Sequence, residues 1–180
     1  SYNNPSVIIR GFLNEGESNF EESRECYEAL IKLVRAQAPN CLVTYASNKI
    51  LEDCFLEEID VVCFNIYPGW YSNDRDDERP LNEIISEINR CTDGLEKRGL
   101  SDKPFIISEI GAGAIYGWRD PICAHWSEEY QEEYLKIVCN EVVSNEKIAG
   151  VSLWQFCDCR TYRGATALMR PRAFNNKGIL

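Results

Sequence analysis

Residues 103–111, Lys-Pro-Phe-Ile-Ile-Ser-Glu-Ile-Gly, place a glutamate at the end of an apolar run that is followed by a glycine turn. Residues 6–16, Ser-Val-Ile-Ile-Arg-Gly-Phe-Leu-Asn-Glu-Gly, repeat this pattern. Both runs are rich in residues that favour β-strands, so we expect a buried strand in each, with Glu109 and Glu15 where the strands stop. In a parallel α/β barrel, the carboxyl ends of the strands are where catalytic residues are placed.

Three more short apolar runs alternate with longer amphipathic segments, which predicts an α/β fold built from βα units around a parallel sheet. The five expected strands cover residues 7–13, 41–45, 61–65, 105–108 and 150–156. The expected helices cover residues 20–38, 81–98 and 128–144. Five strands are too few to close an eight-stranded barrel, so the pattern fits either an open sheet or part of a barrel. An open doubly wound sheet usually has a glycine-rich phosphate turn after its first strand, where this chain has the acidic residues Glu15 and Glu17.

Local signals support the helices. Ala29, Leu30, Leu33 and Val34 would form one apolar face of the first helix. Ser127 is an expected N-cap for the third helix, and Gly99 is an expected stop after the second.

Composition limits the class of protein. With 180 residues and 44% hydrophobic content, the chain fits one globular domain. Its net charge of −10 argues against nucleic-acid binding, which depends on basic side chains. No apolar stretch is long enough for a membrane span, and no export signal is visible at the start.

The nine cysteines are spread through the expected strands and helices, and we expect them to be buried, reduced thiols. The tight pair Cys157 and Cys159 lacks a second pair at zinc-site spacing, so we expect no metal. Reduced thiols are typical of a cytoplasmic setting.

Two carboxylates at strand ends are typical of glycosidases, in which one protonates the leaving oxygen and the other, in retaining enzymes, attacks the anomeric carbon. The alternative is that Glu15 and Glu109 are exposed loop acids, as most acidic residues are. Aromatic residues at two further strand ends favour a sugar site, because their faces stack on pyranose rings. These aromatic residues are Tyr67, Trp70 and Tyr71 after the third strand and Trp154 in the fifth.

Several motifs, in order along the chain, resemble glycoside hydrolase family 2 and in particular its β-glucuronidase branch. Asn14-Glu15 is similar to the family's Asn-Glu acid/base motif, residues 65–71 to its Asn-x-Tyr-x-Gly-Trp-Tyr segment, and residues 107–112 to its nucleophile strand. Residues 126–131 and 154–158 follow in the expected order, and residues 175–178, Asn-Asn-Lys-Gly, resemble the Asn-x-Lys-Gly element that holds the uronic carboxylate.

The resemblance implies a retaining exo-β-glucuronidase in which Glu15 is the general acid/base and Glu109 is the nucleophile. The implied substrate-binding residues are Asn14, Asn65, Tyr67, Tyr71, Trp154, Asn175 and Lys177. No metal or cofactor is implied. The substrate would be a small glycoside, and the full-length enzyme would be a homo-oligomer.

The resemblance also implies that residues 1–180 are the C-terminal portion of a (β/α)8 TIM-barrel catalytic domain, covering about strands 4–8. Because relatives also take substrate contacts from the first three strands, this chain could carry both catalytic glutamates and be inactive alone. The sequence leaves open whether Arg170 or Arg172 reaches the substrate, because the family's arginine would align with Pro171.

Three alternatives remain at this point. A β-galactosidase of the same family is disfavoured by Lys177, which suits a carboxylate. A β-galacturonidase, or an enzyme for another uronide, is an alternative to the β-glucuronidase. A non-catalytic carbohydrate-binding or interaction fragment is disfavoured by the presence of both strand-end glutamates.

Overall fold

The computed structural model describes residues 4–71, 80–161 and 170–180. The chain divides into two compact units. The first consists of Ser1–Ile66, Asn89–Ser108 and Lys147–Gly150. The second consists of Tyr67–Ile88, Glu109–Glu146 and Val151–Leu180.

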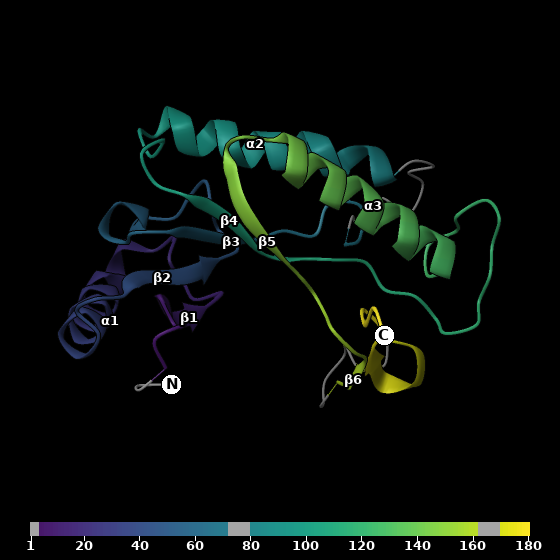
Figure 1. Cartoon of the computed structure of the whole chain (residues 1–180), viewed down its shortest axis with the longest axis horizontal. Helices are drawn as coiled ribbons and strands as arrows, with labels where there is room; N and C mark the ends of the chain where they lie inside the picture. Colours follow the sequence, from purple (N-terminus) through teal and green to yellow (C-terminus); the bar gives the residue numbers. More distant parts are fainter. Residues whose placement is uncertain (1–3, 72–79, 162–169) are drawn as a thin grey trace. The chain divides into compact units, whose positions relative to one another are not determined.

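Five strands form one sheet in the order in which they occur along the chain (Figure 1). They are β1 (Ile9–Asn14), β2 (Leu42–Ser47), β3 (Val62–Asn65), β4 (Phe105–Ile110) and β5 (Ile148–Leu153). β1 pairs with β2 and β2 with β3, both in parallel. The five predicted strands and the α/β class are confirmed. The predicted barrel is not confirmed by these five strands and stays a prediction.

The strand at one edge of the sheet, β1, is more exposed than expected. β3 is buried along its whole length, but Gly11, Leu13 and Asn14 of β1 are exposed. The prediction of a buried first strand was therefore wrong, because β1 has a neighbour on one side only among the described strands. An edge strand with exposed apolar residues is a place where further strands pair.

The three predicted helices are present as α1 (Arg24–Gln37), α2 (Glu83–Lys97) and α3 (Glu128–Ser144). Ser127 caps α3 as expected, since its side chain accepts a hydrogen bond from the backbone N–H of Tyr130 at 3.1 Å. Gly99 ends α2 with a φ of 80°, a left-handed conformation that favours glycine. Four 3-10 turns complete the helical segments: η1 (Glu21–Ser23), η2 (Leu56–Glu58), η3 (Pro80–Asn82) and η4 (Pro171–Ala173).

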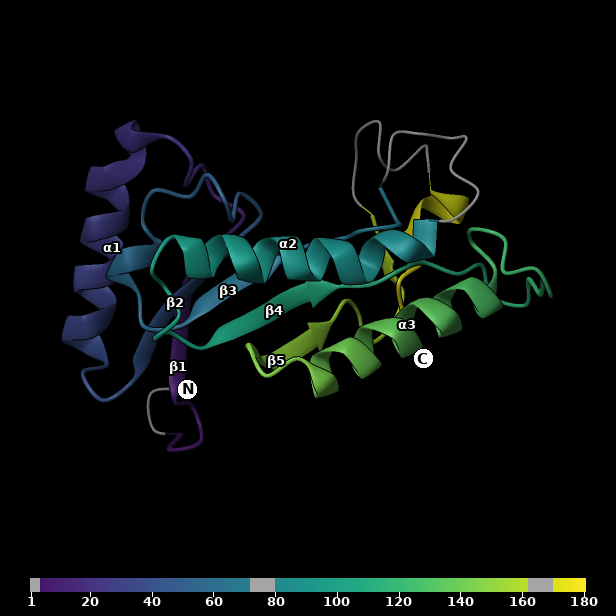
Figure 2. The ribbon, with the colours of Figure 1, turned by 90° about the horizontal axis from the view of Figure 1, so that it is seen from above.

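In the first unit, α1 packs beside β1 and β2 (Figure 2). Its buried residues are Tyr27 and Ile31, four residues apart on one face. The predicted face was partly wrong: Leu33 is 51% exposed and Ala29 is also exposed. The apolar residues of this helix fit either of two neighbouring faces. Tertiary packing selects the face that carries Tyr27, whose ring stacks on that of Phe55 with centroids 4.6 Å apart.

In the second unit, α3 buries Tyr130, Tyr134 and Val138. A short antiparallel pair, β6 (Cys159–Arg160) and β7 (Phe174–Asn175), was not predicted. It orders the segment that leads to Lys177.

The nine cysteines are all free thiols, but the prediction that they are buried holds only for Cys63 and Cys91. Cys26, Cys139, Cys157 and Cys159 are exposed. Within the described ranges, no cluster of three or more His, Cys, Asp or Glu side chains could hold a metal ion. None of the helices described has the length and apolar character needed to cross a membrane.

Candidate active site

A β-bulge positions Asn14 and Glu15 at the end of β1. Gly11 is opposite Thr44 and Asn14 is opposite Ala46, so β1 contains one more residue than β2 over this interval. Bulges of this kind redirect side chains and are frequent beside active sites. Glu15 follows with a φ of 53°, which is strained for a residue other than glycine, and its N–H donates to the carbonyl of Ala46 at 2.9 Å.

Asn65, the last residue of β3, connects the polar side chains of the first unit. It is only 4% exposed. Its Nδ2 donates to Asn14 Oδ1 at 3.0 Å and to Glu15 Oε1 at 2.9 Å, and its Oδ1 accepts from Ser108 Oγ at 2.7 Å. Asn14, Glu15, Asn65 and Ser108 form what we call the amide cluster. It brings together three predicted site residues and one, Ser108, that was not predicted.

Glu109 lies in the second unit, one residue before the end of β4. Its Oε2 accepts a hydrogen bond of 2.6 Å from the hydroxyl of Tyr67. A phenol that donates to a carboxylate favours the ionised form, which is the form that a nucleophile needs. The ring of Tyr67 also contacts that of Tyr71, with centroids 5.3 Å apart.

Lys177 is buried, with 2% of its surface exposed. Its Nζ lies 4.6 Å from the ring centroid of Tyr71, 4.9 Å from that of Trp70 and 5.4 Å from that of Tyr67, and it donates to the hydroxyl of Tyr71 at 2.7 Å. We call these four residues the lysine cage. Burial and the nearby charge of Arg170 lower the pKa of Lys177 to about 7. The ammonium would therefore gain from a carboxylate partner.

The backbone around Lys177 is held on both sides. Asp158 Oδ1 accepts from the N–H of Gly178 at 2.8 Å, and Asp158 Oδ2 accepts from the side chain of Asn176 at 3.1 Å. A Cβ on Gly178 would lie 2.3 Å from the backbone nitrogen of Asp158, so only glycine fits there. The N–H of Gln155 donates to the carbonyl of Lys177 at 2.8 Å.

Arg170 is the arginine that reaches this group. Its Nη2 donates to the hydroxyl of Tyr71 at 3.2 Å. With the Asn175 amide in the orientation that its neighbours favour, Oδ1 accepts from Arg170 Nη1 at 3.1 Å and from Trp154 Nε1 at 3.3 Å. Arg172, in contrast, is exposed and has a φ of 56°. Arg170 is thus the arginine that contacts the lysine cage, and its contact with the substrate stays a prediction.

Trp70 is supported by residues that were not predicted as site residues. His125 stacks on it with ring centroids 4.3 Å apart, and Trp126 meets it edge-on at 4.7 Å. Burial and the nearby Lys177 lower the pKa of His125, the only histidine, which keeps this ring neutral beneath the cage.

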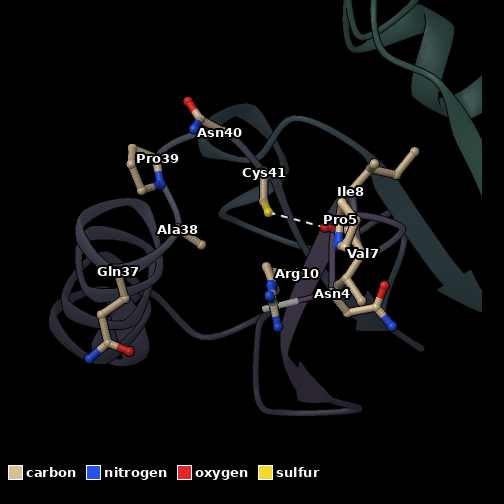
Figure 3. Close-up of a pocket in the computed structure, with 10 residues that line it drawn as sticks. All are labelled: Asn4, Pro5, Val7, Ile8, Arg10, Gln37, Ala38, Pro39, Asn40 and Cys41. Carbon is tan, nitrogen blue, oxygen red and sulfur yellow. Dashed lines mark hydrogen bonds between the residues drawn. The ribbon is translucent and has the colours of Figure 1, made fainter. Parts of the chain in front are cut away.

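A hollow of about 540 Å³ in the first unit is separate from these residues (Figure 3). It lies beside the first residues of β1 and the connection from α1 to β2, where the thiol of Cys41 donates to the carbonyl of Val7 at 3.3 Å. None of the predicted site residues lines it. Because Asn14 and Glu15 lie at the other end of β1, this hollow is not the candidate site.

The structure places the predicted site residues in a strand or within two residues after one, except Tyr71, which lies six residues after β3. Asn14, Glu15 and Asn65 are in the first unit, and Tyr67, Tyr71, Glu109, Trp154, Asn175 and Lys177 are in the second. Their individual roles stay predictions. Sequence reasoning missed Ser108 and Asp158, which act on other protein groups. Ser108 had one available signal, namely a hydroxyl beside a candidate carboxylate at a strand end.

No protein-family model matches the chain. A β-glucuronidase from Paenibacillus borealis is 28% identical over 178 residues, which are 98% of this chain and 28% of that protein. A β-glucuronidase from Rattus norvegicus is 29% identical over 181 residues, covering 98% of this chain and 26% of the relative. The chain thus spans less than a third of the length of these curated relatives.

The solved structures that resemble this chain include enzymes that act on β-uronides as well. A glycoside hydrolase family 2 β-galacturonidase from Eisenbergiella tayi, bound to galacturonate, is 39% identical with a TM-score of 0.88, covering 99% of this chain and 31% of that one. A β-D-glucuronidase from Dictyoglomus thermophilum is 28% identical with a TM-score of 0.84, covering 98% and 29%. These matches confirm the predicted resemblance: the chain is similar, over nearly its whole length, to part of several β-glucuronidases and of a glycoside hydrolase family 2 β-galacturonidase.

Proposed function

We propose that this chain carries the catalytic residues of a retaining exo-β-glycosidase that hydrolyses β-D-glucuronides. One observation supports it above the others: Lys177 is a buried ammonium surrounded by aromatic rings at the strand ends. Within the described ranges no ion pair links Lys177 to a carboxylate, and of the charges around it Glu109 favours the ammonium form while Arg170 disfavours it. A buried cation without such a partner suits a ligand that brings its own carboxylate, as a uronic acid does.

In the first step, Glu109 attacks the anomeric carbon while Glu15 gives its proton to the leaving oxygen, so that the glycosidic bond breaks as the glycosyl ester forms. In the second step, water attacks the anomeric carbon, Glu15 takes the proton of that water, and Glu109 leaves. This chemistry requires the two carboxyl groups to stand about 5 to 5.5 Å apart in the working enzyme. This two-carboxylate chemistry requires no metal.

The aromatic and amide side chains would bind the sugar. Trp154 and Tyr71 are partly exposed, which leaves faces for the pyranose ring. Asn14 accepts from Asn65 through its oxygen, so its own NH2 group is directed elsewhere and can donate to a sugar hydroxyl. Lys177 and Arg170, with Asn175, would bind the uronic carboxylate.

We further propose that the sheet is part of a (β/α)8 barrel, corresponding to about strands 4–8. The consecutive strand order, the parallel pairing of the first three strands and the exposed edge of β1 support this. In such a barrel the remaining strands would pair with the edge of β1 and complete the substrate contacts.

The free state of all nine cysteines supports a reducing, cytoplasmic setting. Homo-oligomerisation of the full-length enzyme stays a prediction.

A second candidate is hydrolysis of β-D-galacturonides. Identity to the β-galacturonidase from Eisenbergiella tayi is 39%, whereas identity to the β-D-glucuronidase from Dictyoglomus thermophilum is 28%. Both sugars carry the same carboxylate and differ in the configuration of one hydroxyl group, so Lys177 serves either.

The experiment compares four 4-nitrophenyl substrates with the full-length enzyme: the β-glucuronide, the β-galacturonide, the β-galactoside and the α-glucuronide. We expect turnover of the first, with the β-anomer of the free sugar as the initial product in NMR spectra. Faster turnover of the β-galacturonide would favour the second candidate. Absence of turnover of all four would contradict catalysis and favour a carbohydrate-binding module.

A further inference from the structure

Ser108 does not belong to the predicted site, yet it makes the shortest hydrogen bond of the amide cluster, 2.7 Å to Asn65 Oδ1. It lies in β4 directly before Glu109. Its partner Asn65 is buried and has no freedom to exchange this bond for one to bulk water. A buried amide oxygen without a donor costs about 1–3 kcal/mol, so the Ser108 hydroxyl determines which orientation of the amide is stable.

The orientation of this amide matters because Asn65 Nδ2 faces two acceptors, Asn14 Oδ1 and Glu15 Oε1. Rotating the amide by 180° would turn its oxygen toward an ionised Glu15 and lose both hydrogen bonds. With Oδ1 bound to the Ser108 hydroxyl, Nδ2 stays directed at Glu15 and Asn14.

This arrangement makes the two oxygens of Glu15 unequal. Oε1 receives an N–H and therefore serves as an acceptor. A proton on Oε1 would point toward the N–H of Asn65 that this oxygen already accepts, and the two hydrogens would repel each other. The neutral form of Glu15 therefore carries its proton on Oε2.

We propose that Ser108 is a positioning residue of the acid/base step: through the amide of Asn65 it directs the proton of Glu15 to Oε2. This inference rests on the proposed glycosidase function. Oε2 then gives its proton to the glycosidic oxygen as the bond to the anomeric carbon breaks, and in the second step it takes the proton from the attacking water.

The test uses leaving groups of different basicity, because a poor leaving group needs protonation far more than a good one. In the full-length enzyme, kcat/KM is measured for the phenyl and the 4-nitrophenyl β-uronide with wild type, Ser108→Ala and Ser108→Thr. We expect Ser108→Ala to lose about tenfold or more on the phenyl substrate and at most about threefold on the 4-nitrophenyl substrate, since one buried hydrogen bond corresponds to about one tenfold step. Ser108→Thr keeps a hydroxyl and should recover most of the loss.

Ser47→Ala is the control, because Ser47 is likewise a hydroxyl near the end of a strand but is buried and contacts Ser18 and the N–H of Lys49 rather than Asn65. It should affect both substrates equally. Equal losses on the two substrates in Ser108→Ala, or no loss, would overturn the positioning role.

Asn65→Asp provides a second measurement that does not depend on Ser108. It replaces the N–H donor by an oxygen facing Glu15 Oε1, so the phenyl substrate should again suffer more than the 4-nitrophenyl substrate. Equal losses would overturn the proposal even if Ser108→Ala fails to fold. If wild type hydrolyses neither substrate, the proposed function itself fails, an outcome distinct from uniform losses in the variants.

Discussion

The amide cluster and the lysine cage both hold a charged group at strand ends, but they do so with opposite chemistry. In the amide cluster, Glu15 is exposed and accepts a hydrogen bond from a neutral amide, which in turn accepts one from a neutral hydroxyl. The lysine cage surrounds an ammonium with aromatic rings and places Arg170 nearby. Neutral donors let a carboxyl gain and lose a proton during each turnover, whereas a desolvated cation suits a ligand charge that never changes. The contrast separates proton transfer from substrate recognition.

The largest expected effect is on the nucleophile, whose loss should stop turnover of every substrate. Glu109→Ala should lower kcat by roughly 10⁴-fold or more for uronides with either leaving group, as the removal of other enzymic nucleophiles does. Added azide should restore turnover and give the glycosyl azide of the opposite anomer. Glu133→Ala, on the exposed face of α3, is the control. Turnover that persists in Glu109→Ala without azide would assign the nucleophile elsewhere.

Removal of the acid/base Glu15 should lower activity nearly as much, but only for substrates whose leaving group must be protonated. Glu15→Ala should reduce kcat/KM for the phenyl β-uronide by about 10²–10⁴-fold, with a much smaller loss for the 2,4-dinitrophenyl substrate. Azide should here give the glycosyl azide of the same anomer as the substrate. The adjacent exposed Glu17→Ala should behave as wild type. A loss independent of the leaving group would remove the amide cluster from proton transfer.

The lysine cage should control which sugar is accepted. Lys177→Met should lower kcat/KM for the 4-nitrophenyl β-uronide by about 10²–10³-fold, because the substrate carboxylate then meets an uncharged cage. The β-galactoside, which has no carboxylate, should lose little or even gain. Lys136→Met, which removes an exposed lysine paired with Glu133, is the control. Equal losses on charged and neutral sugars would exclude Lys177 from carboxylate recognition.

The same lysine should make binding depend on pH. Because burial and Arg170 hold the pKa of Lys177 near 7 while Glu109 acts in the opposite direction, the free enzyme loses this charge as the pH rises through about 7. A bound carboxylate favours the charged form, so binding takes up a proton above pH 7. The inhibition constant of a free uronic acid should then rise by up to about tenfold per pH unit. Lys177→Met should abolish this slope, and a slope unchanged in the variant would assign the titration to another group.

The smallest effect concerns the support of the cage. Asp158→Ala removes the acceptor for the N–H of Gly178 and for the side chain of Asn176, on either side of Lys177. Two lost hydrogen bonds at an exposed position should raise KM for the uronide by about three- to tenfold, with kcat nearly unchanged. Asp120→Ala, which instead removes the acceptor for the N–H of Ile122, should leave KM as it is. A fall in kcat without a change in KM would mean that Asp158 supports the chemistry rather than binding.

Much of this arrangement could be predicted from the sequence, because short apolar runs mark strands and the polar residues that follow them share one edge of a parallel sheet. Glu15 and Glu109 were found in this way, whereas Asn65 was predicted from the family resemblance. Ser108 was not, because alternation along a strand gives the face of a side chain but not its partner. The β6–β7 pair and the Asp158 contacts depend on segments that meet only in the folded unit. Leu33 was misplaced because periodicity alone does not choose between adjacent helix faces.

The most direct test of the central claim is to trap the glycosyl-enzyme intermediate. The full-length enzyme would be incubated with a 2-deoxy-2-fluoro-β-uronosyl fluoride, which forms the ester quickly and hydrolyses it slowly, and the labelled peptide would be identified by mass spectrometry. We expect one uronosyl group per chain, attached to Glu109, with labelling greatly slowed in Lys177→Met. A label on another residue, or labelling by the fluorogalactosyl analogue at the same rate as by the uronosyl compound, would contradict the account.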